Sequence, residues 1–199
     1  MTLTSDYFDQ LYATHEDPWD FRRRWYEARK RGLTLAALAR PRYASVFEPG
    51  CSIGELSAAL AERCDALLSC DCAKDAVATA RRRLASYPHV RVEHRALPGD
   101  WPAGTFELIV LSEIGYYFSA EDLTTILKRA VDALCAGGVL LACHWRPVVA
   151  GYPLTGDGVH ALIDRTINLP RLLRHEEDDF LLELWSRDDR SVAQAENLR

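Results

Sequence analysis

One stretch of the chain, residues 46–61, has a residue order that fixes its local fold. It begins with two apolar residues, continues with Glu48, turns through a loop that contains Gly50 and Gly54, and ends in an amphipathic run. Glycine allows a sharp turn and lets the backbone approach a ligand where a side chain would block it. The helix that follows presents free N–H groups in its first turn. The stretch predicts a strand, a tight loop and a helix, with either ligand binding or an ordinary turn at the loop.

A second acid, Asp71, ends the next apolar run, residues 66–70. Adenosine-binding α/β domains place an acid about 20 residues past the glycine turn, at the tip of the second strand, where it accepts hydrogen bonds from the ribose hydroxyls. A carboxylate suits this role because it can accept from two O–H donors at once. The alternative is that Asp71 only caps the helix that begins near Lys74. We expect Asp71 to bind a ribose.

Apolar runs and amphipathic segments alternate along most of the remaining chain. Residues 106–111 are almost continuously apolar, as expected for a strand that is covered on both faces. Alternating strands and helices favour a parallel α/β sheet. The expected strands are residues 44–48, 66–71, 89–93, 106–113 and 139–145, and the expected helices are residues 53–64, 74–85, 119–134 and 159–167. Residues 169–174 and 180–185 flank an acidic turn and predict a terminal β-hairpin.

The segment before this alternation, residues 1–40, combines aromatic residues with arginines. Its apolar spacing predicts a short helix near the N-terminus and a second helix from Phe21 to Ala39, separated by the break Asp17-Pro18-Trp19-Asp20. The arginines form either a solvated basic face or part of a lid over a ligand. We interpret residues 1–40 as a helical lid, residues 41–190 as the binding domain and residues 191–199 as a polar tail.

Composition and charge argue against several functions. The formal net charge of −5 does not favour a nucleic-acid or anionic-membrane partner. No apolar run reaches the ~20 residues of a membrane span, and the N-terminus lacks the basic and apolar parts of a signal peptide, so we expect a cytoplasmic protein. The six cysteines lack Cys-x-x-Cys spacing and are expected to be free thiols. No cluster of ligands has metal-site spacing, so we expect no metal.

Residues 46–61 resemble the first motif of class I S-adenosylmethionine (SAM) methyltransferases, in which an acid, a Gly-x-Gly-x-Gly-like loop and a helix hold the amino acid part of the cofactor. Ser52 stands at the middle glycine position. The resemblance implies SAM as cofactor and a Rossmann-like fold, a mostly parallel seven-stranded sheet with a terminal antiparallel β-hairpin. The residues that it places at the cofactor are Glu48, Gly50, Cys51, Ser52, Gly54, Asp71, Cys72, Ala96, Leu97 and Glu113. Ala96 replaces the acid that usually binds the adenine amino group, so Leu97 is expected to pack on the purine and offer its backbone N–H.

Three further features narrow the resemblance: Asp17-Pro18-Trp19 followed by Tyr26-Glu27-Ala28-Arg29, the segment 106–118, and the length of 199 residues. They are similar to features of the nodulation protein S (NodS-type) methyltransferases, which N-methylate the free amine of the terminal glucosamine of a chitooligosaccharide. The resemblance, over about residues 6–145, implies a methyltransferase for a small-molecule or saccharide acceptor, acting as a monomer or homodimer. The alternatives are an O-methyltransferase of another small metabolite and a SAM-binding module without catalysis. The expected acceptor contacts are Trp19, Tyr26, Arg29, Tyr116 and Tyr117.

Two residues are expected to take part in catalysis. Methyl transfer from a sulfonium is an in-line displacement, for which the protein mainly supplies proximity and alignment. An amine attacks only when it is neutral, so a group that takes its proton helps. Ligands of open α/β sheets lie beyond the carboxyl ends of the strands, which is where Glu113 and His144 are expected. Each could instead be structural. His160 is expected on the surface.

Overall fold

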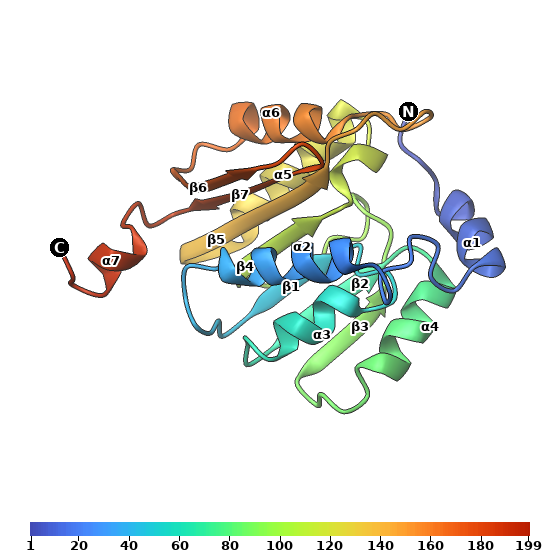
Figure 1. The fold of residues 1–199 in the computed structure, drawn as a ribbon, viewed down its shortest axis with the longest axis horizontal. Helices are drawn as coiled ribbons and strands as arrows, with labels where there is room; N and C mark the ends of the chain where they lie inside the picture. The colour runs from blue at the N-terminus through green and yellow to red at the C-terminus, as the bar shows by residue number, and fades with distance from the viewer.

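The computed structural model describes all 199 residues. Its centre is a seven-stranded sheet with the order β3-β2-β1-β4-β5-β7-β6, covered by helices on both faces (Figure 1). Neighbouring strands from β3 across to β5 pair in parallel, whereas β7 runs antiparallel to both β5 and β6. The strands are β1 Val46–Pro49, β2 Leu67–Asp71, β3 Val90–His94, β4 Phe106–Ser112, β5 Leu134–Trp145, β6 Arg171–Glu176 and β7 Phe180–Ser186. The predicted fold, including the terminal hairpin, is confirmed.

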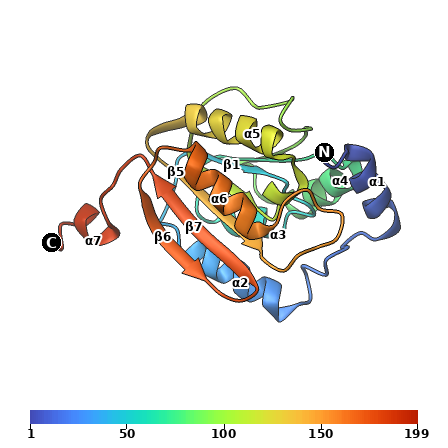
Figure 2. The same ribbon diagram turned by 90° about the horizontal axis from the view of Figure 1, so that it is seen from above.

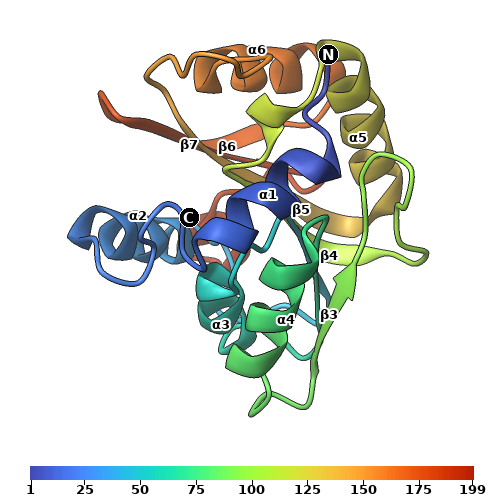
Figure 3. The ribbon, with the colours of Figure 1, turned by 90° about the vertical axis from the view of Figure 1, so that its right-hand side faces the viewer.

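The helices occupy both sides of this sheet and the ends of the chain. They are α1 Ser5–Thr14, α2 Trp25–Ala36, α3 Glu55–Ala61, α4 Lys74–Arg83, α5 Ala120–Ala133, α6 Gly156–Thr166 and α7 Val192–Ala195, with a short 3-10 helix η1 at Gly115–Tyr117. In Figure 3, α5 and α6 lie on one side of the sheet, and α2 and α3 on the other. None of these helices combines the length and apolar character needed to cross a membrane.

Successive residues of the central strands enter two different cores. Val46 and Phe47 are both at most 1% exposed. Phe47 packs in the same cluster as Ile109, with side chains of α5 and α6, whereas Val46 packs with Leu108 and side chains of α3. This is the period of two that a strand imposes on its side chains. Burial of each such side chain contributes ~1.5–3 kcal/mol, so the nearly continuous apolar runs of β1 and β4 hold the centre of the sheet.

The start of α2 differs from the prediction. The helix begins at Trp25 instead of Phe21, because the Asp17 carboxylate accepts hydrogen bonds from the backbone N–H groups of Phe21 and Arg22, at 2.9 and 3.1 Å. These bonds hold the preceding segment in a turn. Trp25, the first residue of the helix, is 77% exposed. The buried face of the helix carries the polar residues Glu27, Lys30 and Thr34.

The boundary between α5 and β5 also differs from the prediction. β5 begins at Leu134, five residues earlier than expected, because Leu134 pairs with Phe106 at the start of β4. Gly137 and Gly138 therefore lie within the strand.

The N-terminal helix packs on the body of the protein, whereas the C-terminal residues do not. α1 lies beside α4, at the right-hand edge of the molecule in Figure 1. The helix buries Phe8 and Tyr12. The C-terminal residues extend away from the sheet (Figure 2). The predicted polar tail contains the short helix α7, and Ser191 and Gln194 form a capping box at the start of this helix.

Candidate active site

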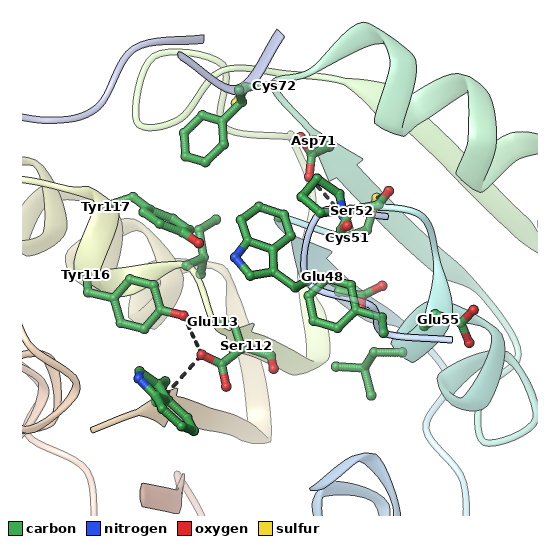
Figure 4. Close-up of a pocket in the computed structure, with 18 of the residues that line it drawn as sticks. Glu48, Cys51, Ser52, Glu55, Asp71, Cys72, Ser112, Glu113, Tyr116 and Tyr117 are labelled. Atoms are coloured by element: carbon green, nitrogen blue, oxygen red, sulfur yellow. Dashed lines mark hydrogen bonds between the residues drawn. The ribbon is translucent and has the colours of Figure 1, made fainter. Parts of the chain in front are cut away.

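A cavity of about 580 Å³ lies beyond the carboxyl ends of β1, β2, β4 and β5 and is covered by side chains of residues 1–40. This volume is typical of small-molecule sites. Thirteen of the predicted site residues line it: Trp19, Tyr26, Glu48, Gly50, Cys51, Ser52, Asp71, Cys72, Ala96, Leu97, Glu113, Tyr116 and Tyr117. Figure 4 shows Asp71 and Ser52 on one side of the cavity, and Glu113, Tyr116 and Tyr117 on the other. We refer to these two sides, after the roles predicted from the sequence, as the cofactor half and the acceptor half.

The loop after β1 takes the left-handed conformation at three positions. Gly50, Ser52 and Gly54 have φ angles of 72°, 50° and 81°. A Cβ atom on Gly50 would lie 2.7 Å from Ile114 Cδ1, so this position requires glycine. Gly54 does not line the cavity, and a Cβ there would lie 3.3 Å from atoms of Ala80 and Leu84 on and beside α4. The prediction that Gly54 contacts the cofactor is therefore wrong, because its role is to turn the chain into α3 and to let α4 pack closely.

Asp71 joins this loop to the tip of β2. Its two carboxylate oxygens accept hydrogen bonds from the N–H groups of Ser52 and Ala73, at 2.8 and 2.9 Å. Burial raises the pKa of Asp71, and these N–H donors oppose that rise. The carboxylate thus caps the start of α4 and also lines the cavity, where each oxygen keeps a lone pair for a ribose hydroxyl. The two interpretations of Asp71 are compatible.

Glu48 lies behind the loop. Its carboxylate is 2% exposed and accepts hydrogen bonds from Ser57 Oγ and Ser69 Oγ, at 2.5 and 2.8 Å. Burial raises the pKa of Glu48 to about 7, although the two hydroxyls oppose the rise. This acid therefore titrates near neutrality.

Ala96, Leu97 and Phe118 also line the cavity. The Ala96 N–H donates to Asp100 Oδ2 at 3.1 Å, so Asp100 holds this turn. The Leu97 N–H makes no hydrogen bond within the protein. An apolar wall with one free N–H donor is compatible with the purine contact predicted for this segment, which stays a prediction.

The acceptor half is built around Glu113, which has a φ angle of 56°. One oxygen, Oε1, accepts a hydrogen bond from Lys30 Nζ at 2.7 Å. The other, Oε2, accepts from the Tyr116 hydroxyl and from the Trp145 N–H. These three donors over-determine the position of Glu113 and hold the strained backbone in place. Glu113 thus lies at the acceptor half, and its expected contact with the cofactor stays a prediction.

Two charged residues of this half were not predicted. Lys30 is 5% exposed and Glu27 is 8% exposed, and Lys30 Nζ lies 3.0 Å from Glu27 Oε2. Burial lowers the pKa of Lys30, but Glu113 and Glu27 outweigh it and raise the value above its usual range. Their spacing of three, with Thr34 four residues beyond Lys30, places all three on one helical face. This spacing is the one feature of the sequence that could have indicated a shared buried face. It was not interpreted so, because polar residues of a helix are usually assigned to its solvated face.

Aromatic side chains form the walls around this charged group. Tyr116 stacks on Tyr152 with ring centroids 5.3 Å apart, and Tyr26 meets Trp145 edge to face at 5.6 Å. The Tyr26 hydroxyl is buried and has no hydrogen-bond partner. Tyr26 lines the cavity with its ring, while its hydroxyl lies buried beside the site.

Arg29 does not line the cavity, so its predicted acceptor contact is wrong. Its guanidinium forms a bidentate pair with the Glu177 carboxylate, at 2.8 and 2.7 Å. Arg29 lies three positions from Tyr26 but faces the β6–β7 hairpin, because Glu177 offers it a planar partner there.

The structure also contradicts the prediction for His144. It is fully buried and does not line the cavity. Its Nε2 accepts from the Gly115 N–H at 3.0 Å, and its Nδ1 lies 3.1 Å from His160 Nε2. His160, expected on the surface, is 2% exposed and contacts Glu183 Oε2 at 2.6 Å. Burial and the neighbouring His160 keep the pKa of His144 well below its usual value. The predicted role of His144 as an accessible base is therefore wrong; it supports the turn that holds Tyr116.

Comparison with solved structures identifies the class of this protein. A candidate methyltransferase from Pseudomonas syringae matches with 55% identity and a TM-score of 0.75, over 82% of this chain and 100% of that chain. The N-methyltransferase NodS from Bradyrhizobium japonicum WM9, in complex with S-adenosylhomocysteine (SAH), matches with 21% identity and a TM-score of 0.79, over 92% of this chain and 97% of that chain. The fold, the glycine loop and the acid at the tip of β2 are those of a class I SAM-dependent methyltransferase.

Sequence comparison identifies the family. The family model described as nodulation protein S (NodS) matches residues 7–165. Nodulation protein S from Rhizobium tropici is 28% identical over 128 residues, which cover 63% of this chain and 54% of that protein. The match thus spans about half the length of this curated relative. The chain belongs to the NodS family.

Proposed function

We propose that this protein transfers the methyl group of SAM to the amine of a small acceptor, and that the acceptor is an amino sugar or an oligosaccharide that carries one. The observation that carries the proposal is the continuity of the two halves of one cavity. An adenosine-type site lies at one end, and a buried acidic group lined by aromatic rings lies at the other.

The cofactor half fits SAM. Asp71 keeps lone pairs for two ribose hydroxyls, Leu97 keeps a free N–H for the purine, and the loop around Gly50 brings the backbone close to the cavity. When bound, SAM supplies a methyl group already activated on a sulfonium. The residues of the chain therefore have to bind and align the two reactants and exclude water.

The acceptor half fits an amine. Glu27, Glu113 and Lys30 together carry one net negative charge when all three are ionised, so the group favours a cation in a site of low dielectric constant. The rings of Tyr26, Tyr116 and Trp145 offer apolar faces and positions for cation–π contact. The NodS structure from Bradyrhizobium japonicum is described as an N-methyltransferase, which supports the same chemistry.

The test is methyl transfer from radiolabelled SAM to matched acceptors. A glucosamine oligosaccharide with a free terminal amine should be methylated, and its N-acetylated counterpart, which lacks the nucleophile, should be inert. Calorimetry should show SAH binding in the presence of a chelator. Methylation of a phenol or carboxylate with the free amines inert would refute the acceptor class, and SAH binding without transfer to any acceptor would favour a binding module.

A further inference from the structure

The two carboxylates beside Lys30 differ in how completely the protein satisfies them. Glu113 accepts hydrogen bonds from three donors on three segments: Lys30, the Tyr116 hydroxyl and the Trp145 N–H. Glu27 has Lys30 as its only partner, at 3.2 Å from Oε1 and 3.0 Å from Oε2. An ionised carboxylate offers about four lone-pair sites. Glu27 therefore has about half of these sites free, although it is 8% exposed and lines the cavity.

From this difference we propose that Glu27 takes the proton that the acceptor ammonium must lose, while Glu113 fixes Lys30 and the wall of the site. The assignment rests on the proposed N-methylation. The ammonium gives one proton to the Glu27 carboxylate, which becomes neutral. The lone pair of the free amine then forms the N–C bond as the C–S bond breaks, and that electron pair stays on sulfur. The secondary ammonium product leaves, and Glu27 returns its proton to water.

The surroundings of Glu27 suit this role. Burial raises the pKa of Glu27, and Lys30 opposes that rise. Glu113, beyond β4, raises it further, and Arg31 on the same helix lowers it. A carboxyl group with a raised pKa is a better proton acceptor from an ammonium than an ordinary glutamate, because the transfer is less uphill. Lys30 stays paired with Glu113 at 2.7 Å, so the cluster keeps a compensated charge when Glu27 is protonated.

The decisive experiment compares Glu27→Gln with the parent protein on two acceptors. One is a primary amine that is an ammonium at neutral pH, and the other is its alkoxyamine analogue, which is already neutral. Glu27→Gln should lower kcat for the ammonium acceptor by about 10²–10⁴-fold. The kcat of this variant should recover as the pH rises toward the pKa of the amine itself. Its kcat for the alkoxyamine should stay close to that of the parent, and its Kd for SAH should not change. Glu177→Gln, at a carboxylate outside the cavity that pairs with Arg29, is the matched control and should keep both activities.

Four results would overturn the assignment. Equal losses on both acceptors with parallel pH profiles would leave Glu27 with a structural role only, and an unchanged kcat on the ammonium would exclude it as the base. A parent protein that methylates neither amine would refute the proposed function, and this assignment with it. If Glu27→Gln does not fold, Glu27→Asp keeps the carboxylate and should retain the parent's pH profile at reduced kcat; a lost profile would count against the proposal.

Discussion

The buried acid Glu48 makes the stability of this protein depend on pH. Both of its serine partners donate to one oxygen, Oε2. Glutamine has the same shape and one acceptor oxygen, so Glu48→Gln can keep both hydrogen bonds while it removes the titrating group. The variant therefore isolates the contribution of the charge.

The size of the effect follows from the two pKa values. The group has an ordinary pKa of 4.5 when unfolded, and burial raises it to about 7 in the folded protein. Between these values the unfolded chain binds fewer protons than the folded one, so the free energy of unfolding falls as the pH rises. The stabilising contribution is complete below pH 4.5 and is lost as the pH rises through about 7. At about 1.4 kcal/mol per pH unit, the total loss is about 3 kcal/mol.

Equilibrium urea unfolding of the parent and Glu48→Gln, without cofactor, measures this loss. The difference in free energy of unfolding between the two proteins should shift in favour of the variant by about 3 kcal/mol between about pH 4.5 and about pH 8. All other titrating groups are common to both proteins and largely cancel in this difference. A difference that stays constant across the range would show that Glu48 titrates alike in both states, and would refute the reasoning from burial.

Three further predictions test the rest of the site. Asp71→Ala should weaken SAH binding roughly 10- to 150-fold, because the ribose hydroxyls lose a charged acceptor worth ~1.5–3 kcal/mol. The variant should also have a lower thermal stability, since two backbone N–H groups lose their partner. If calorimetry shows an unchanged affinity, Asp71 acts only as a helix cap. Hydrogen exchange in α1 should slow when SAH is added, because its Tyr12 hydroxyl contacts Ser52 Oγ at 2.5 Å on the cofactor loop; identical exchange would mark residues 5–14 as fixed packing. Glu113→Gln should lower kcat about 10²-fold through misplacement of Lys30 and leave SAH affinity unchanged, and full activity would remove Glu113 from the site.

The local sequence predicted most of the cofactor half. Strand, glycine loop and helix follow one another within residues 46–61, and Asp71 lies at the tip of the next strand, so their arrangement depends on short-range geometry that residue order specifies. The alternation of apolar runs and amphipathic segments likewise predicted the parallel sheet and its terminal hairpin, because strands and helices each have a characteristic period of apolar residues in the sequence. The errors at Trp25 and at the start of β5 arose where a distant partner or a capping carboxylate, not the period, set the boundary.

The acceptor half was decided by the tertiary structure. Lys30 meets Glu113 across 83 positions of the chain, and Arg29, one residue away, is drawn out of the cavity by Glu177, 148 positions distant. Helical period says which residues share a face, but not what that face meets. His144 stands at the expected end of β5, yet its side chain points into the protein toward Gly115 and His160. The sequence by itself determined which residues could bind and ionise; only the packing of α2 and the hairpin against the sheet decided which of them face the cavity, because charge pairs and burial depend on neighbours that are remote in the chain.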